Sequence, residues 1–486
     1  MTRQIRLLGV ALMLCFGVLF VQLNRLTVFE AASLNDNPNN TREILRDFTQ
    51  PRGTITSADG VVLARSVPSD DRFELQREYP EGALFSAITG YYSFTLGSSG
   101  VEKTYNSELA GRTLDLSLQD IGDLFVDKER VGDLTLTVRA DLQRIATEQL
   151  GQRKGSVVAL DPRTGAILAM VSFPTYDPNV LADHDTQAAA AAATELNANP
   201  DKPRLSRAYQ DRYFPGSTFK VVTATAGLTS GAVSADAPVY PVSNGYTAPG
   251  TSRPLRNFGG ASCGGALFEV LRVSCNTAFA QMGVETGPEA MIKTAEAYGF
   301  NKDVPIDLTN PARSNFPTDF ERNLPALAQS AIGQNEVAAT PLQMAMVAAA
   351  VANDGEVMAP HVLDEVRDTD GNIVDRYDED VWTTAMDRGT AALMREAMIG
   401  VAERGTATRL QVEGFVVGGK TGTAQLGTDP PRSHAWIIGF AGPPGEAPSI
   451  AVAVVIEGQE GASEQTGGRV AAPIAQAVLQ AYLTTP

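Results

Sequence analysis

The sequence has few of the residues from which metal sites and nucleic-acid sites are built. It contains three cysteines and three histidines among 486 residues. The histidines lie far apart, and no cysteine pair stands beside one at the spacing of zinc ligands, so we expect no metal and no other cofactor. Its 39 Lys and Arg against 56 Asp and Glu give a net charge of −17. This balance does not supply the clustered cations that a phosphate backbone needs, so we exclude nucleic acid as a partner.

Charge is also missing from a long run near the N-terminus. Residues 7–21 are apolar and the run continues a little further, with two arginines before it. A stretch of roughly 17 to 20 residues can just span a bilayer. A cleaved signal peptide is the alternative, but the small residues Ala31 and Ala32 lack a second small residue two positions earlier, as processing requires. We therefore predict a cytoplasmic tail at 1–6, a single-pass anchor in the cell membrane at 7–26, and an extracytoplasmic catalytic domain.

The part of the chain that follows divides in two. Residues 27–133 mix short β-rich runs with turns and are too few for a second large catalytic core, so we interpret them as a non-catalytic pedestal. From residue 134 to 486 the pattern is strongly ordered, and we assign this stretch to one catalytic domain. The β-rich runs of the pedestal are Gly53–Ile55, Val61–Ala64 and Gly100–Lys103.

The catalytic stretch has strand patterns at both of its ends. An Asp-Pro-Arg-Thr-Gly turn separates two early runs, which predicts a β-hairpin. Three more runs come late, and an α-rich region at about 221–400, with a methionine stripe that we interpret as core, lies between. We therefore predict an α+β fold in which helices flank one antiparallel five-stranded sheet. The predicted strands are 156–160, 166–171, 415–420, 435–441 and 450–456, with helices at 141–150, N-capped by Asp141, and 471–483.

Three short motifs follow one another along this domain. They are Ser217-Thr218-Phe219-Lys220, Ser274-Cys275-Asn276 and Lys420-Thr421-Gly422-Thr423. Each is weak alone, but no other lysine has a serine three residues before it. The competing string Ser33-Leu34-Asn35 precedes any plausible nucleophile, so only Ser274 falls between the other two motifs.

Ser217 is predicted to open a helix, because an extended stretch precedes it and an apolar run follows. Its hydroxyl would then lie where free backbone N–H groups favour developing negative charge. Lys220 lies three residues on, on the same face. It can accept the proton of Ser217 only if its pKa falls several units from the usual value of about 10.4. Burial and a second cation both lower it, and Lys420 is the candidate cation.

The remaining motif residues fit a peptide substrate. Ser274 can relay a proton between the two lysines, and Asn276 offers a donor and an acceptor to a bound backbone. The N–H groups of Thr423 and Ser217 would form an oxyanion hole, worth on the order of 3 kcal/mol per donor. The hydroxyls of Thr421 and Thr423 could hold a substrate carboxylate, and Gly422 leaves room for close approach.

The cysteines leave one question open. Cys15 falls in the predicted span, whereas Cys263 and Cys275 would face an oxidising compartment. These two could form a disulfide that clamps the Gly-rich loop 259–263 to the middle motif, or remain two separate buried thiols.

Together these strings closely resemble the class B penicillin-binding proteins, and most closely their actinobacterial branch. The resemblance implies a penicillin-binding transpeptidase fold of the serine β-lactamase type and a D,D-transpeptidase that acts on peptidoglycan stem peptides. Ser217 would attack the D-Ala–D-Ala bond and β-lactams would trap it, with Lys220, Ser274 and Lys420 as its catalytic partners. The strings are Pro51-Arg52-Gly53, Gly100-Val101-Glu102-Lys103, Ser172-Phe173-Pro174, Tyr176-Asp177-Pro178-Asn179, Phe214-Pro215-Gly216-Ser217, Gly333-Gln334 and Lys420 to Gln425.

Differences from two related classes of penicillin-interacting enzymes exclude those classes. About 107 residues without histidine are too few for the glycosyltransferase domain of a bifunctional enzyme. A class A β-lactamase would carry a deacylating Glu between the second and third motifs, and none fits. A penicillin-binding receptor or divisome scaffold, and a D,D-carboxypeptidase, stay as alternatives. The expected partners are stem peptides, β-lactams, the membrane and division or elongation proteins, including a glycosyltransferase.

Overall fold

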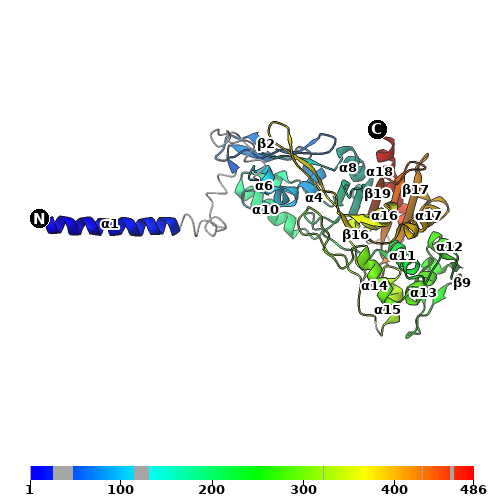
Figure 1. Ribbon diagram of the computed structural model, residues 1–486. Coiled ribbons are helices and arrows are strands. Elements are labelled where there is room, and N and C mark those ends of the chain that lie inside the picture. Colours follow the sequence, from blue (N-terminus) through cyan, green and yellow to red (C-terminus); the bar gives the residue numbers. More distant parts are fainter. Residues whose placement is uncertain are drawn as a thin grey trace. The chain divides into compact units, whose positions relative to one another are not determined.

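The computed structural model describes residues 2–25, 48–113, 131–320, 322–429, 431–459 and 465–485 (Figure 1). The chain divides into two compact units. One comprises Met1–Pro51 and Val67–Gln76, and the other comprises Arg52–Ser66 and Arg77–Pro486. The string Ser33-Leu34-Asn35 and the small pair at 31–32 lie outside the described residues.

The N-terminal helix α1 (Thr2–Asn24) contains the apolar run. Its segment Arg6–Asn24 is 19 residues long and strongly apolar, and it buries none of its side chains within the protein. A helix of this length and composition is consistent with a single-pass anchor or a signal sequence.

Five antiparallel strands form the central sheet, in the order β17-β18-β19-β7-β8. The early hairpin and the three late strands therefore lie in one sheet, as the sequence predicts. Strands β18 and β19 are buried almost throughout, which explains why they read as continuous apolar runs rather than alternating ones. The strands are β7 (Gly155–Leu160), β8 (Ile167–Phe173), β17 (Val416–Gln425), β18 (Ser433–Gly442) and β19 (Ile450–Ile456).

Helices cover this sheet. Helices α8 (Ala140–Leu150) and α18 (Ala472–Thr484) pack against each other and against the sheet, and α17 (Arg388–Arg404) lies along β17. Helix α16 (Pro341–Ala352) contacts β18 and β19, and every one of its residues is buried. Its methionines, Met344 and Met346, therefore belong to the core, as their spacing predicts.

An α-rich region lies beyond the sheet, between β8 and β17 in the sequence. Helix α11 packs against α13 and α14, and α13 also packs against α15 (Figure 1). The Phe219 ring, just before α11, stacks on Phe316 and meets Phe300 edge-to-face, with centroids 5.3 and 5.4 Å away. The helices are α11 (Lys220–Ser230), α12 (Leu267–Arg272), α13 (Asn276–Thr286), α14 (Pro288–Ala297) and α15 (Leu324–Ser330).

A second sheet has six strands, in the order β15-β14-β6-β1-β2-β3. Strands β14 and β15 come from the sequence after α16, yet they extend the sheet that begins in the predicted pedestal. Strand β6 joins the two groups, since it pairs in parallel with β1 and antiparallel with β14. The strands are β1 (Ile55–Thr56), β2 (Val62–Pro68), β3 (Leu75–Glu78), β6 (Asp133–Leu136), β14 (Leu363–Arg367) and β15 (Ile373–Arg376).

A buried ion cluster joins the segment just before β1 to strand β3. Glu102 is fully buried and accepts hydrogen bonds from Arg52 Nε and Arg77 Nε, both at 2.7 Å. Although burial opposes ionisation, Arg77 and Arg52 hold the pKa of Glu102 below its usual value. Arg77 also donates to the Gly53 carbonyl at 2.8 Å. The Arg52 and Glu102 strings of the resemblance thus meet in one structural cluster.

Two local predictions are wrong. The run Gly100–Lys103, predicted to be β-rich, lies in the short helix α5 (Gly100–Thr104), where Glu102 turns inward to its arginines. Asp141 does not cap the helix that follows it, because α8 begins one residue earlier. The carboxylate of Asp59, in a turn 81 residues away, accepts instead from the Ala140 N–H at 2.9 Å.

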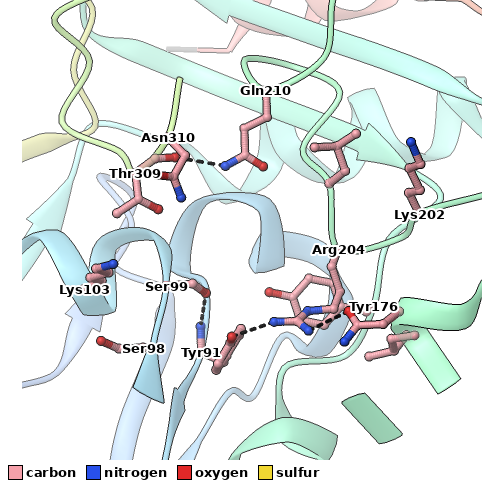
Figure 2. A pocket seen from close by; sticks show the side chains of 13 residues that line it. Tyr91, Ser98, Ser99, Lys103, Tyr176, Lys202, Arg204, Gln210, Thr309 and Asn310 are labelled. Atoms are coloured by element: carbon pink, nitrogen blue, oxygen red, sulfur yellow. Dashed lines mark hydrogen bonds between the residues drawn. The ribbon is translucent and has the colours of Figure 1, made fainter. Parts of the chain in front are cut away.

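A pocket of about 500 Å3 lies beside the short strands β4 (Tyr92–Ser93) and β5 (Gly97–Ser98) and helix α10 (Thr186–Ala198) (Figure 2).

The other described helices and strands are α4 (Ser86–Thr89), α6 (Asn106–Leu109), α9 (Asn179–Ala182), β9 (Tyr240–Ser243), β10 (Gly245–Tyr246), β11 (Leu255–Arg256), β12 (Cys263–Gly265), β13 (Glu356–Met358) and β16 (Val381–Thr384).

Candidate active site

Ser217 lies in a single 3₁₀ turn, η4 (Gly216–Phe219), which leads directly into α11. Ser217 is partly exposed, whereas the next three residues are buried. The turn rests on strand β17: a Cβ on Gly216 would lie 2.8 Å from the Thr423 carbonyl oxygen. The backbone of Gly216 also has φ +53°, so glycine is required both by conformation and by space. The first and third motifs are therefore in direct contact.

Lys220 begins α11 and is fully buried. Side chains three residues apart in a 3₁₀ turn lie on the same side, so we expect Lys220 and Ser217 to share one side of this turn. Its ammonium group donates to the Ser274 carbonyl at 2.7 Å, the Ser274 hydroxyl at 3.2 Å and Asn276 Oδ1 at 2.6 Å. The first and second motifs are thus joined through one nitrogen.

Lys420, on β17, approaches the same serine. It is fully buried, and its Nζ lies 2.8 Å from Ser274 Oγ and 2.9 Å from the Thr421 carbonyl oxygen. Burial lowers the pKa of Lys420 to about 7. Burial and the charge of Lys420 hold the pKa of Lys220 well below its usual value. Both shifts favour loss of a proton from this pair of lysines, and the neutral lysine that results can accept a proton.

Ser274 holds this position through an unusual backbone. Its φ is +60°, rare for a serine, in the bend between α12 and α13. The Ser274 N–H donates to the Leu271 carbonyl at 3.1 Å, and the next N–H, of Cys275, donates to Val270 at 2.8 Å. These bonds close the end of α12 and direct the serine toward the lysines.

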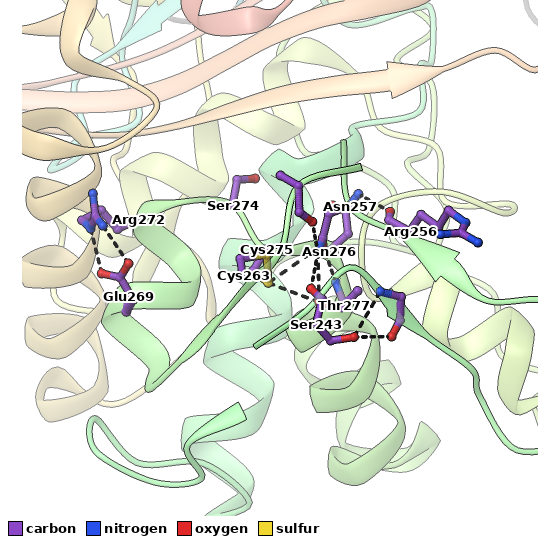
Figure 3. Close-up of a disulfide and its surroundings, with 12 residues drawn as sticks. Ser243, Arg256, Asn257, Cys263, Glu269, Arg272, Ser274, Cys275, Asn276 and Thr277 are labelled. Carbon is purple, nitrogen blue, oxygen red and sulfur yellow. Dashed lines mark hydrogen bonds and ion pairs between the residues drawn. A yellow bond between two sulfur atoms is a disulfide. The ribbon is translucent and has the colours of Figure 1, made fainter. Parts of the chain in front are cut away.

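A disulfide and a buried asparagine brace the middle motif (Figure 3). Cys275 is bonded to Cys263, with their Cα atoms 5.8 Å apart. Asn257 accepts from the Thr277 N–H at 3.0 Å and donates to the Ala261 carbonyl at 2.9 Å, so it ties the start of α13 to the Gly-rich loop. Asn276, the middle motif's third residue, spans the same region, because its Nδ2 donates to the Arg256 carbonyl at 3.1 Å.

Strand β17 is the edge of the central sheet and runs past the serine turn. A Cβ on Gly422 would lie 2.9 Å from the Pro215 carbonyl oxygen, so this glycine permits the contact. Thr423 is partly exposed, and Thr421 is only 8 % exposed. The Thr421 hydroxyl donates to the hydroxyl of Thr406 at 2.6 Å.

Thr406 was not singled out by the sequence. It follows α17 and belongs to none of the three motifs, and no local pattern marks it. Its contact with Thr421 adds a second hydroxyl beside β17.

A second group that the sequence did not reveal supports the serine turn. Trp436 Nε1 donates to the Phe214 carbonyl at 3.0 Å, and Tyr213 donates to Glu457 Oε1 at 2.9 Å. Arg207 Nε donates to the same carboxylate oxygen at 2.6 Å. These partners lie far apart in sequence, so no spacing could have indicated them.

The site is built from hydroxyl, ammonium and amide groups. Among the described residues, no three His, Cys, Asp or Glu side chains come together as metal ligands.

Family models match both parts of the chain. The model of the penicillin-binding protein transpeptidase domain matches residues 155–480, and that of the penicillin-binding protein A dimerisation domain matches residues 52–134. The chain therefore belongs to the penicillin-binding protein transpeptidases, as its three motifs predict.

Within that family, the chain is similar over its whole length to PbpA proteins of mycobacteria. It is 38% identical to peptidoglycan D,D-transpeptidase PbpA of Mycolicibacterium smegmatis, over 99% of both chains. It is 36% identical to PbpA of Mycobacterium tuberculosis, again over 99% of both. The structure of penicillin-binding protein A from M. tuberculosis as a ceftriaxone acyl-enzyme superposes with a TM-score of 0.83, covering 90% of this chain and all of that one, at 36% identity. The predicted fold class and actinobacterial resemblance are confirmed.

Proposed function

We propose that Ser217 is the nucleophile of this chain, which is a class B peptidoglycan D,D-transpeptidase that β-lactams acylate. One observation carries the assignment: the ammonium groups of Lys220 and Lys420 both reach Ser274 Oγ, at 3.2 and 2.8 Å, and Lys220 directly follows the turn that carries Ser217. This arrangement supplies a proton acceptor, a relay and a cation in one water-poor site.

In acylation, Lys220 in its neutral form removes the hydroxyl proton of Ser217, and Ser217 Oγ attacks the carbonyl carbon of the penultimate D-Ala. The resulting tetrahedral oxyanion collapses and the C–N bond to the terminal D-Ala breaks. The proton passes from Lys220 through Ser274 to the departing amine, so D-Ala leaves neutral at nitrogen. In its charged form, Lys420 lowers the proton affinity of Lys220 by repulsion.

In deacylation the same groups act in reverse. The amine of a neighbouring stem peptide attacks the ester carbonyl and gives its proton, through Ser274, to Lys220. The C–O bond to Ser217 then breaks and the serine recovers its proton, which completes one cross-link. With water in place of the amine, the reaction would be a carboxypeptidase reaction.

The oxyanion would lie between the N–H groups of Ser217 and Thr423. In an antiparallel strand the N–H and C=O of one residue point the same way, and the Thr423 carbonyl faces the serine turn at Gly216. The Thr423 N–H therefore also points away from β18 and toward the turn. The start of α11 adds a favourable dipole for the negative charge.

An extended peptide would bind along the edge of β17. In the described sheet no strand lies beyond this edge, so its N–H and C=O groups can pair with a substrate backbone. Asn276 would contact the substrate amide from the opposite side, and Gly422 would allow close approach. Thr421 and Thr423, together with Thr406, would bind the terminal carboxylate through their hydroxyls.

The setting of the reaction is also a proposal. Helix α1 would anchor the chain in the cell membrane with the N-terminus in the cytoplasm and the catalytic domain outside, where stem peptides occur. The enzyme would act in cell-wall growth or division beside a glycosyltransferase, because neither of its two matched domains polymerises glycan.

The test is labelling and turnover by the full chain. Ser217→Ala should lose all covalent labelling by fluorescent penicillin, whereas Thr218→Ser, which keeps the hydroxyl bonded to the Pro215 carbonyl, should still be labelled. With a D-Ala–D-Ala peptide and an amine acceptor, the wild type should form the cross-linked product. Only hydrolysis would favour a carboxypeptidase. Growth restored by Ser217→Ala in depleted cells would favour a scaffold.

A further inference from the structure

The pocket beside β4, β5 and α10 is separate from the three motifs. It encloses about 500 Å3, and Figure 2 draws the 13 residues that line it. Its walls come from three stretches of chain, 91–103, 176–210 and 309–310, and none of these lining residues belongs to the candidate active site. A cavity of this size accommodates a ligand of several tens of atoms.

Three cations line the pocket, and its described lining includes no carboxylate. They are Lys103, Lys202 and Arg204. The chain as a whole has a net charge of −17, so a positive pocket opposes the general charge of the molecule. The other polar lining groups are neutral donors and acceptors: Ser98, Ser99, Asn197, Gln210, Thr309 and Asn310.

The ammonium groups of Lys103 and Lys202 are available to a ligand. Within the described part of the chain, neither side chain makes a hydrogen bond or an ion pair. Figure 2 shows them on opposite sides of the pocket. Asp201, next to Lys202 in sequence, forms its ion pair with Lys154 instead. Cations that line one pocket without a counterion among the described residues favour the binding of an anion.

Among the residues that the structure describes, the partners of the Arg204 side chain are neutral. Its Nη2 donates to the Tyr91 hydroxyl at 2.6 Å and its Nη1 to Asn197 Oδ1 at 2.9 Å. The guanidinium also lies 5.3 Å from the centroid of the Tyr91 ring. These contacts fix its plane without neutralising its charge, which suits recognition of a carboxylate.

The walls are tied together before any ligand arrives. Tyr91 and Tyr176 pack edge-to-face with centroids 6.5 Å apart, and both side chains are buried. Gln210 Nε2 donates to the Thr309 carbonyl at 2.9 Å and so links two of the three stretches. A pocket held in this way loses little entropy on binding.

We propose that this pocket binds a carboxylate-bearing peptide of peptidoglycan, at a position distinct from Ser217. The inference rests on the proposed function, because that substrate is a polymer whose uncross-linked stem peptides end in free carboxylates. The cations match the carboxylates, the neutral amide and hydroxyl groups match a peptide backbone, and the tyrosines offer apolar edges. Occupancy would hold a neighbouring stretch of cell wall on the enzyme during cross-linking.

The experiment uses the full chain in detergent, acylated to completion with penicillin so that the cleft at Ser217 is filled. Calorimetric titration with a soluble muropeptide should then still detect binding, which weakens as salt is added. Lys103→Gln combined with Lys202→Asn should weaken it at least tenfold. Asn suits position 202, where φ is +48°. Lys103→Arg, which keeps the charge, and Lys293→Gln, at an exposed lysine of α14, should leave binding unchanged.

The outcomes of this experiment separate the inference about the pocket from the proposed function. Binding that survives the double substitution, or no binding to fully acylated wild type, would overturn the inference, while penicillin labelling would still support Ser217 as the nucleophile. An acidic all-L peptide of equal charge that binds as tightly would overturn the assignment to peptidoglycan. Failure of penicillin to label Ser217 would instead count against the proposed function.

Discussion

Lys220 and Lys420 meet on a single oxygen: Ser274 Oγ lies 3.2 Å from one ammonium nitrogen and 2.8 Å from the other. The two lysines come from distant parts of the sequence, and each is fully buried. Because they share this contact, the two lysines titrate as a coupled pair, and the number of protons that the site binds depends on both.

Ser274→Ala removes the oxygen that joins the two lysines. We expect acylation by penicillin to slow by about 10²- to 10⁴-fold, the usual contribution of a group that transfers protons. The second-order rate constant for labelling measures it. Ser230→Ala, at the end of α11, is the control and should label normally. An unchanged rate for Ser274→Ala would remove the relay from the mechanism.

The acylation rate should depend on pH through both lysines. Burial lowers the pKa of Lys420 to about 7, so its positive charge is present below that pH and is lost above it. We expect the rate to decline on the alkaline side, because Lys220 then regains proton affinity, and to decline in acid as Lys220 becomes protonated. Lys420→Arg stays charged and should lose the alkaline decline, whatever its absolute rate. A wild-type rate that still rises at pH 9 would contradict this.

Gly216→Ala tests the contact between the serine turn and β17. The new Cβ would lie 2.8 Å from the Thr423 carbonyl oxygen, so the turn must shift relative to β17 and disturb the proposed oxyanion hole. We expect acylation to slow by about 100-fold, the order of losing one oxyanion donor. Gly231→Ala is a matched control: its φ is also positive, at +75°, but no atom lies within 4 Å of the added Cβ. It should cost about 1 kcal/mol of stability and leave labelling intact.

The Cys263–Cys275 disulfide closes a loop across the middle motif, with a sequence separation of 12. Replacing both cysteines with serine should lower the free energy of unfolding by about 2 to 3 kcal/mol and slow acylation, because Ser274 is less firmly held. Denaturant titration and labelling measure the two effects. Cys15→Ser, in α1, should change neither. If mass analysis after alkylation without reductant finds both thiols free, the disulfide is absent and this prediction is wrong.

The Glu102 cluster should be important for stability rather than for chemistry. Glu102→Gln removes the buried negative charge that both Arg52 and Arg77 contact, and we expect a loss of about 3 to 5 kcal/mol. The exposed pair Arg65–Glu78 provides the comparison, and Glu78→Gln should cost less than about 1 kcal/mol. Equal effects of the two substitutions would mean that burial of the cluster contributes nothing.

Sequence reasoning predicted the central sheet well because its strands are long, apolar and separated by clear turns. The motif at Lys420 could be placed on a strand for the same reason, and the resemblance supplied the family. Asp59 as the cap of α8 could not be found, since the carboxylate acts across 81 residues while Asp141 stood at the usual place. The run Gly100–Lys103 was predicted to be β-rich but is helical. Its Glu102 points to two arginines that only the folded protein brings together.

The supports of the site were equally hidden. Thr406 and Glu457 have no motif around them, and each acts on a partner chosen by the fold: Thr421 for the first, Tyr213 and Arg207 for the second. A spacing rule detects groups on one helix or one strand. It does not detect a hydroxyl that arrives from the end of a distant helix.

Strands β14 and β15 have a consequence for how this protein can evolve. They come from the catalytic half of the sequence but complete a sheet begun by β1 and β2. Exchange of the segment that precedes β6 with that of a relative would have to match the pairing edge of β6 as well as the buried arginines. Recombination at that boundary is therefore constrained, and we expect the segments before and after β6 to evolve together.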